Sequence, residues 1–230
     1  FRNIIINGDM SLAQRATSET GITNASGDVF VADRFCWSES GGMTSQFTMS
    51  QDTDVPAGYG FAKSLKLDCT TTDTPATTER IRIETRFEGQ NLQYLKKGTA
   101  NAESWTLSFW VKSVKTGTYI VNFRDEDNAR IVSKAYTISS ANTWEKKIVT
   151  VAPDTTDPFD NDNAHSLTVA WILSAGSSLQ SGSLADVWQD YANANYAAGQ
   201  VNFADNTANN FWITGVQLEA GTTASDFEFL

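Results

Sequence analysis

The chain has 230 residues, and 27 Asp and Glu residues against 17 Lys and Arg residues give it a formal net charge of −10 at pH 7. An acidic protein repels phosphate backbones and anionic lipid surfaces. Its longest clean apolar stretch, residues 167–173, is far shorter than the roughly 20 residues of a helical membrane span. We therefore expect no nucleic-acid partner and no membrane insertion.

Hydrophobic residues make up 40% of the chain, with thirteen Phe, seven Trp and six Tyr, so there is ample material for a core. The length fits a single domain, residues 1–230, and the start at Phe1 rather than Met indicates part of a longer polypeptide. Cys36 and Cys69 lie in strand-like runs, and we expect two buried free thiols.

Short runs with period-2 alternation, separated by Gly, Asn, Asp, Ser and Thr, dominate the chain. They predict strands at 3–7, 30–38, 44–50, 64–69, 80–87, 105–112, 119–124, 131–138, 144–151, 167–173 and 211–218. We expect the runs 105–112 and 119–124 to form a hairpin, and 185–198 to be an ordered loop packed by its aromatics. The predicted fold class is all-β: a two-sheet antiparallel jelly-roll sandwich of about ten strands.

The same alternation predicts which side chains of three strands point away from the core. These outward side chains form the candidate ligand-binding set: Trp110, Asn122, Arg124, Arg80, Arg82, Glu84 and Arg86. An outward aromatic beside amides and charges suits a sugar, which offers an apolar C–H face and a hydroxyl edge. The alternative is that Trp110 is covered by the loop 187–196 or by a neighbouring subunit.

Groups suited to catalysis are scarce. His165 is the only histidine and lies in a polar loop, and no Gly-x-Ser-x-Gly motif is present. Glu79, Glu84 and Glu88 could supply a glycosidase carboxylate pair, but Arg80, Arg82 and Arg86 alternate with them, which favours ion pairing on the surface instead. We predict no catalytic residues and no enzyme, with a glycan depolymerase as the alternative.

The acidic run 154–163 offers oxygen ligands of the kind that calcium prefers, but Ala164 breaks the EF-hand pattern. We expect a solvated acidic loop there.

Blocks at both ends of the chain carry a resemblance to a known group of proteins. Residues 3–11 (NIIINGDMS), 13–15 (AQR) and 32–35 (ADRF) resemble the opening of many bacteriophage tail-fibre and related virion proteins, and 211–221 (FWITGVQLEAG) with Phe227-Glu228 resembles their close. In the middle, 105–112, 117–123 and 143–151 are similar to the core strands of carbohydrate-binding jelly rolls appended to xylanases and glucanases.

This resemblance implies a tail-fibre module that attaches the virion to the host surface, outside the cell, through non-catalytic glycan binding. It also implies a homotrimer whose partners are other virion tail proteins and a bacterial surface glycan or receptor. The alternatives are a carbohydrate-binding module of a glycoside hydrolase and a purely structural virion or fibre-assembly domain.

The same resemblance implies a structural calcium held near Gly8-Asp9 and by an acid in the last strand. This sequence has Thr214 where that acid is expected, so Asp9 is the one metal candidate left and we expect no cofactor.

Overall fold

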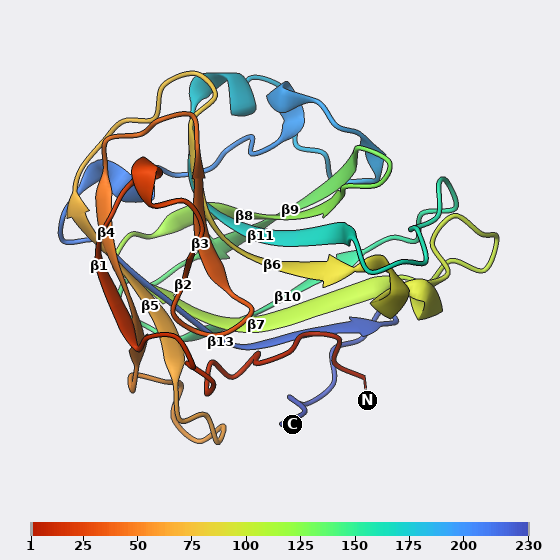
Figure 1. Ribbon diagram of the computed structural model, residues 1–230, viewed down its shortest axis with the longest axis horizontal. Helices are drawn as coiled ribbons and strands as arrows, with labels where there is room; N and C mark the ends of the chain where they lie inside the picture. Colours follow the sequence, from red (N-terminus) through yellow and green to blue (C-terminus); the bar gives the residue numbers. More distant parts are fainter. Residues whose placement is uncertain (1, 230) are drawn as a thin grey trace.

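Thirteen strands and six three-residue 3₁₀ helices form the regular structure of residues 2–229, the part of the chain that the computed structural model describes. The strands form two antiparallel sheets stacked as a jelly-roll sandwich (Figure 1). The six-stranded sheet has the order β1 (Ser18–Ile22), β4 (Gln46–Asp52), β5 (Ser64–Thr71), β13 (Asn210–Ala220), β7 (Trp105–Ser113) and β10 (Glu145–Val151). The seven-stranded sheet has the order β12 (Gln189–Asp190), β9 (Arg130–Ile138), β8 (Gly117–Asp125), β11 (His165–Ala175), β6 (Arg80–Glu88), β3 (Cys36–Ser40) and β2 (Val29–Phe30).

The 3₁₀ helices lie in the connections between strands. They are η1 (Asn24–Ser26), η2 (Gly89–Asn91), η3 (Gln93–Leu95), η4 (Ser177–Leu179), η5 (Asn193–Asn195) and η6 (Phe203–Asp205). Within residues 2–229, none of the helices has the length and apolar character that crossing a bilayer requires.

Aromatic side chains fill the space between the two sheets. Trp105 and Phe109 of β7, Phe123 of β8 and Trp171 of β11 are almost completely buried. Their rings meet edge to face, with centroids 6.2 Å apart for Trp105 and Phe123 and 5.7 Å apart for Phe109 and Trp171. Because inward residues alternate with outward ones, each of these strands contributes one side to this core and the other to the surface or to a covering segment.

Most predicted strands are confirmed to within a few residues, and the all-β sandwich is confirmed with them. Residues 3–7 were predicted as a strand, which is wrong: they form an irregular segment, although the Ile4 amide donates to the carbonyl of Leu218. The predicted strand 30–38 is interrupted by a turn between β2 and β3, and β1 and β12 were not predicted.

The predicted hairpin of residues 105–112 and 119–124 is also wrong. β7 pairs with β10 and β13, whereas β8 pairs with β9 and β11. The connection between β7 and β8 therefore crosses from one sheet to the other. Alternation on both strands is equally compatible with a hairpin and with such a crossing, which is why the pattern did not distinguish them.

The two terminal segments are fastened to each other at β13. Asn3 accepts from the Leu218 amide at 3.0 Å, and the Val216 amide donates to the Gly8 carbonyl at 2.9 Å. A Cβ at Gly8 would lie 2.0 Å from the Val216 carbonyl oxygen, so only glycine permits this approach. The Glu228 side chain accepts from backbone amides at the start of the chain, and Figure 1 shows the two ends next to each other. The residues that carry the resemblance at both ends thus form one clasp.

Residues 176–200 cover part of the outer face of the seven-stranded sheet (blue at the top of Figure 1). Leu179, Ala185 and Tyr196 of this segment pack on Ile120 and Ile172 of the sheet in a second, smaller apolar cluster. This segment includes the predicted ordered loop 185–198, which is confirmed apart from the short β12 and η5.

A buried ion-pair network lies at one end of the sandwich. The Lys97 ammonium is 1% exposed and lies 2.6 Å from Asp125 and 3.2 Å from Asp154. Arg130 donates to Asp154 at 3.0 Å. Burial alone would raise the pKa of Asp154, but hydrogen bonds from Arg130 and the charge of Lys97 lower it on balance. The acidic run 154–163 was expected to be solvated throughout, and its first residue instead belongs to this network.

We expect Lys97→Met to lower the free energy of unfolding by about 3–5 kcal/mol, because it leaves two buried carboxylates without their shared cation. Lys96→Met is the matched control: Lys96 pairs with Glu103 on the exposed surface, and its loss is expected to cost no more than about 1 kcal/mol. Urea unfolding of both variants measures the difference. Equal stability of the two would show that the network contributes little.

Candidate functional site

A pocket of about 210 Å³ opens on the outer face of the seven-stranded sheet. Four of its lining residues are arginines, and we call it the arginine pocket. The lining residues are Arg80, Arg82, Glu84 and Arg86 of β6; Asn122 and Arg124 of β8; Glu126; His165, Thr168 and Ala170 of β11; and Tyr196.

The register of the three central strands explains why the sheet is hollow at this point. Ala170 of β11 lies directly between Glu84 of β6 and Asn122 of β8. A methyl group flanked by two longer polar side chains leaves a depression in the sheet surface. Tyr196 of the covering segment lines the pocket as well, so this part of the face is a hollow and not a flat strip.

The next row along the sheet carries two arginines. Arg86 and Arg124 lie on either side of Thr168, two strand spacings or about 10 Å apart at the backbone. Six of the seven residues predicted from the sequence as ligand-binding, all except Trp110, therefore line one pocket.

Glu84 is the central counter-charge of the pocket. Its side chain is 2% exposed and accepts hydrogen bonds from Arg82 and from Arg86, the latter at 2.7 Å from Nε. Burial alone would lower the pKa values of both arginines, but both are raised on balance. The largest opposing cause is the Glu84 carboxylate for Arg86, whereas for Arg82 it is Tyr196, followed by Glu84. Both arginines that flank this glutamate pair with it; its carboxylate is buried, whereas the Arg86 side chain is 37% exposed.

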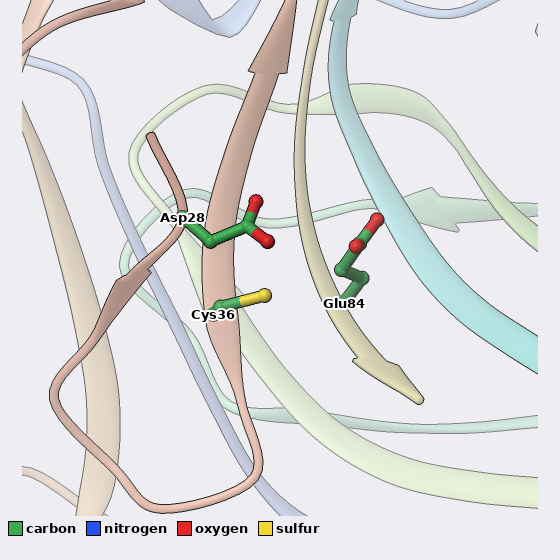
Figure 2. Close-up of side chains that lie close together, drawn as sticks. All are labelled: Asp28, Cys36 and Glu84. Atoms are coloured by element: carbon green, nitrogen blue, oxygen red, sulfur yellow. The ribbon is translucent and has the colours of Figure 1, made fainter. Parts of the chain in front are cut away.

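Glu84 also belongs to a cluster with Asp28 and Cys36, whose ligand atoms lie within 4.8 Å of one another (Figure 2). The two carboxylates hold Arg86 between them, with its Nη2 2.7 Å from Asp28. Burial raises the pKa of the Cys36 thiol to about 12, which disfavours the thiolate that a metal would need. The cluster is thus filled by a guanidinium group. Cys36 and Cys69 are free and buried, as predicted.

Asn122 is the unusual residue of the pocket. Its side chain is 1% exposed, and neither Oδ1 nor Nδ2 has a hydrogen-bond partner among residues 2–229. Leaving a buried amide unpaired costs about 1–3 kcal/mol, so folded proteins rarely keep one. An unpaired amide on the wall of a pocket can recover that cost when a polar ligand binds.

Two arginines of the pocket rest on tyrosine rings of the covering segment. The Arg124 guanidinium lies 4.6 Å from the centroid of Tyr191, and that of Arg80 lies 5.1 Å from the centroid of Tyr196. Such stacking fixes the plane of a guanidinium without using its N–H groups. The covering segment therefore orients charged groups at the pocket.

His165 continues the pocket along β11. Its Nε2 lies 2.9 Å from the Thr168 hydroxyl, which donates in turn to Glu126 at 2.8 Å. Burial lowers the pKa of His165, the charge of Glu126 opposes that shift, and the charge of Arg86 adds to it. The sequence analysis placed His165 in a polar loop, whereas it begins β11.

Trp110 does not share a face with the other six predicted residues. It lies on β7 of the six-stranded sheet and points outward from the opposite side of the sandwich. The covering segment therefore cannot reach it. Instead Tyr59 packs on it, with ring centroids 4.3 Å apart.

Trp110 lies in a second cavity of about 330 Å³, the aromatic cleft, lined also by Tyr59, Phe61, Phe227 and Phe229. The cleft depends on Gly215, which has a φ of 62° at an irregularity in the pairing of β13 with β7. A Cβ there would lie 2.6 Å from the ring of Phe61 and 3.0 Å from that of Trp110.

Asp9 lies in a turn, where its carboxylate accepts from the Ser11 hydroxyl at 3.0 Å. Thr214 donates to the Lys63 carbonyl at 2.7 Å. The only group of three close acidic, cysteine or histidine side chains within residues 2–229 is the one around Arg86, and Asp9 is not part of it. The expectation about calcium stays a prediction.

The sequence analysis missed Thr168 and Ala170, which alternate with buried apolar residues in β11. That alternation was a usable signal, but the run was interpreted only as an apolar strand. Tyr191 and Tyr196 come from a loop, whose position no periodicity predicts.

Because the chain has a single histidine, NMR titration of its ring protons reports on the pocket directly. We expect the pKa of His165 to lie below 6.5, to fall further in Glu126→Gln and to rise in Arg86→Gln. The unfolded chain then binds a proton more readily, so stability is lost as the pH falls from 6.5 through the folded pKa. A pKa at or above 6.5 that neither variant moves would contradict the described surroundings of the ring.

No protein-family model matches the chain, and no curated protein matches it. Among solved structures, it is similar to the enzymatically active domain of tailspike protein 4 of bacteriophage CBA120, with 14% identity, a TM-score of 0.45, and coverage of 95% of this chain and 21% of that one. It is similar to a family 4 carbohydrate-binding module, with 14% identity, a TM-score of 0.44, and coverage of 94% and 99%. It is also similar to the family 11 carbohydrate-binding module of a Clostridium thermocellum cellulosomal cellulase, with 9% identity, a TM-score of 0.41, and coverage of 92% and 99%. The chain thus spans about a fifth of the tailspike chain.

Proposed function

We propose that this protein is a non-catalytic glycan-binding module and that the arginine pocket is its sugar site. The observation that carries the proposal is the buried, unpaired amide of Asn122 on the wall of the pocket. A sugar hydroxyl both donates and accepts, and an asparagine amide offers one group of each kind. The pocket's volume of about 210 Å³ suits one sugar ring better than a long chain segment.

The other polar groups support the same function. The Thr168 hydroxyl already donates to Glu126, so it can only accept from a ligand, and the guanidinium groups of Arg86 and Arg124 flank it. Such fixed polar groups around a small hollow orient a polar ligand.

The surroundings of the two pocket carboxylates fit a binding site better than a catalytic site. A glycosidase needs one carboxyl group that delivers a proton and a second that acts as base or nucleophile. Glu84 is held by two guanidinium groups, and Glu126 by Arg124 and Thr168. Because both carboxylates are held in ion pairs, we keep a glycan depolymerase only as the alternative function.

For the biological setting, we propose a bacteriophage tail-fibre module that attaches the virion to a glycan on the bacterial surface. The support is the sequence resemblance at the two ends of the chain, whose residues the structure joins in one clasp. The homotrimer, the other virion tail proteins as partners and the location on the virion belong to this proposal. A module of a glycoside hydrolase and a purely structural virion domain remain the alternatives.

We expect Asn122→Leu to weaken glycan binding about 5- to 150-fold, since it removes hydrogen bonds together worth about 1–3 kcal/mol. The variant should be no less stable than the parent, because an unpaired buried amide is replaced by an apolar group of similar size. Binding is measured on an array of bacterial surface polysaccharides, and stability by thermal unfolding.

Trp110→Ala is the control, because it changes the opposite face of the sandwich. We expect it to keep full glycan binding. If Trp110→Ala abolishes binding while Asn122→Leu retains it, the sugar site lies in the aromatic cleft and the proposal for the arginine pocket fails.

A further inference from the structure

The arginine pocket holds more arginines than the acidic composition of the chain leads us to expect. The chain has eight arginines and a net charge of −10, yet four of the eight line this one small hollow. Cations gathered in an acidic protein need either internal counter-charges or an anionic ligand.

Three of the four arginines, Arg82, Arg86 and Arg124, have internal counter-charges. Glu84 accepts from Arg82 and Arg86, and Asp28 lies 2.7 Å from Arg86 on its other side. The fourth, Arg80, has no carboxylate partner among residues 2–229 and stacks on Tyr196. It lies six residues from Arg86 along β6, roughly 20 Å away at the backbone, and far from Asn122 and Thr168.

Arg124 pairs with Glu126, but its N–H groups are left without hydrogen-bond acceptors in the described part of the chain. Its Nε lies 3.0 Å from Glu126 but lacks hydrogen-bonding geometry, and no side-chain or backbone acceptor within residues 2–229 receives a hydrogen bond from this guanidinium. The side chain is 32% exposed, and Tyr191 supports one face of it. A guanidinium that is stacked on a ring and has free N–H groups at the edge of a pocket can bind an oxyanion through two parallel hydrogen bonds.

The neighbours of Arg124 determine which oxyanion suits the site. Asn122 is two residues away on the same strand face, and Thr168 is its partner on β11. These two side chains recognise hydroxyl or amide groups, so the ligand must carry such groups within a few ångströms of its anionic group. A sugar ring with a carboxylate substituent combines both.

We propose that the glycan bound in the arginine pocket is acidic and that Arg124 pairs with the carboxylate of the bound sugar residue. This inference rests on the proposed glycan-binding function. It assigns Asn122 and Thr168 to the hydroxyl or amide groups of the same residue, and leaves Arg82 and Arg86 to hold Glu84 in place.

The test compares acidic polysaccharides with their carboxyl-reduced forms, which differ only in having a primary alcohol in place of each carboxylate. Titration calorimetry measures the binding of each polymer to the full chain. The probes are native and carboxyl-reduced hyaluronan, heparosan, alginate, polygalacturonate and polysialic acid. We expect at least one native polymer to bind, and its reduced form to bind at least about tenfold more weakly, because a hydrogen-bonded charge pair is lost.

Arg124→Gln identifies the residue responsible. We expect the variant to bind the native and the reduced polymer equally and weakly. Arg15→Gln is the matched control, since Arg15 also stacks on an aromatic ring, 4.8 Å from Phe30, and its replacement changes the net charge equally. The control should keep the full preference for the native polymer. The ring signal of His165 gives a second measurement, because a bound carboxylate raises the pKa of this histidine in the parent protein and a neutral sugar does not.

The outcomes separate this inference from the proposed function. Equal binding of native and reduced polymers that is lost in Asn122→Leu would keep the glycan site and overturn the acidic ligand. A preference for the native polymer that survives in Arg124→Gln would overturn the role of Arg124. If none of the five polymers binds in either form, the inference fails, whereas the proposed function fails only if the array of bacterial surface polysaccharides also shows no binding.

Discussion

The alternation of side chains along β6, β8 and β11 is the constraint on which both the core and the pocket depend. Each inward residue of these strands packs in the aromatic interior, so each outward residue must end on one shared face. A shift of register by one residue in any of the three strands would exchange the two sets. The apolar core therefore fixes the position of Asn122 and Arg124 as firmly as it fixes that of Phe123 between them.

The covering segment converts this face from an open surface into a pocket. Its apolar side chains pack on Ile120 and Ile172, and Ser133 of β9 donates to the segment through both the backbone amide and the hydroxyl. Tyr191 and Tyr196 then support the two arginines that Glu84 does not hold. The covering segment thus both packs on the sheet and orients the guanidinium groups, and loosening the segment would affect both.

The two groups of buried ion pairs differ in how fully their polar groups are hydrogen-bonded. Lys97, Asp125 and Asp154 satisfy one another in a closed network far from solvent, as a structural network should. In the pocket, by contrast, Glu84 is satisfied while Asn122 and Arg124 are not. Unsatisfied polar groups beside satisfied ones in the same hollow are the main reason to regard this face as a binding site.

The sequence predicted the fold class and the facing of individual strands, because period-2 alternation is a local property. It assigned Arg80, Arg82, Glu84 and Arg86 to the outward side of one strand and Asn122 and Arg124 to that of another, and the structure brings these together. It failed for Trp110, because alternation says which way a side chain points within a strand but not to which sheet the strand belongs. The hairpin error at residues 113–117 has the same origin.

Tertiary contacts explain what the sequence could not predict. Tyr191 and Tyr196 reach the pocket through a loop without periodicity, and residues 3–7 lack a strand because they bond to β13 only at isolated points. The blocks at the two ends of the chain carried the resemblance to known proteins. In the structure, their residues Asn3 and Gly8 form the clasp, and Gly215 allows the close packing beside it. These residues support the fold and do not themselves line the arginine pocket.

The hollow above Ala170 is where we propose that a sugar binds. A crystal structure of the protein with a bound acidic oligosaccharide would locate the ligand. We expect a sugar ring between Glu84 and Asn122, hydrogen bonds from the Asn122 amide to the ring substituents, and a carboxylate at Arg124. A sugar stacked on Trp110 in the aromatic cleft, with the arginine pocket filled only by water, would show that the site is on the other face of the sandwich.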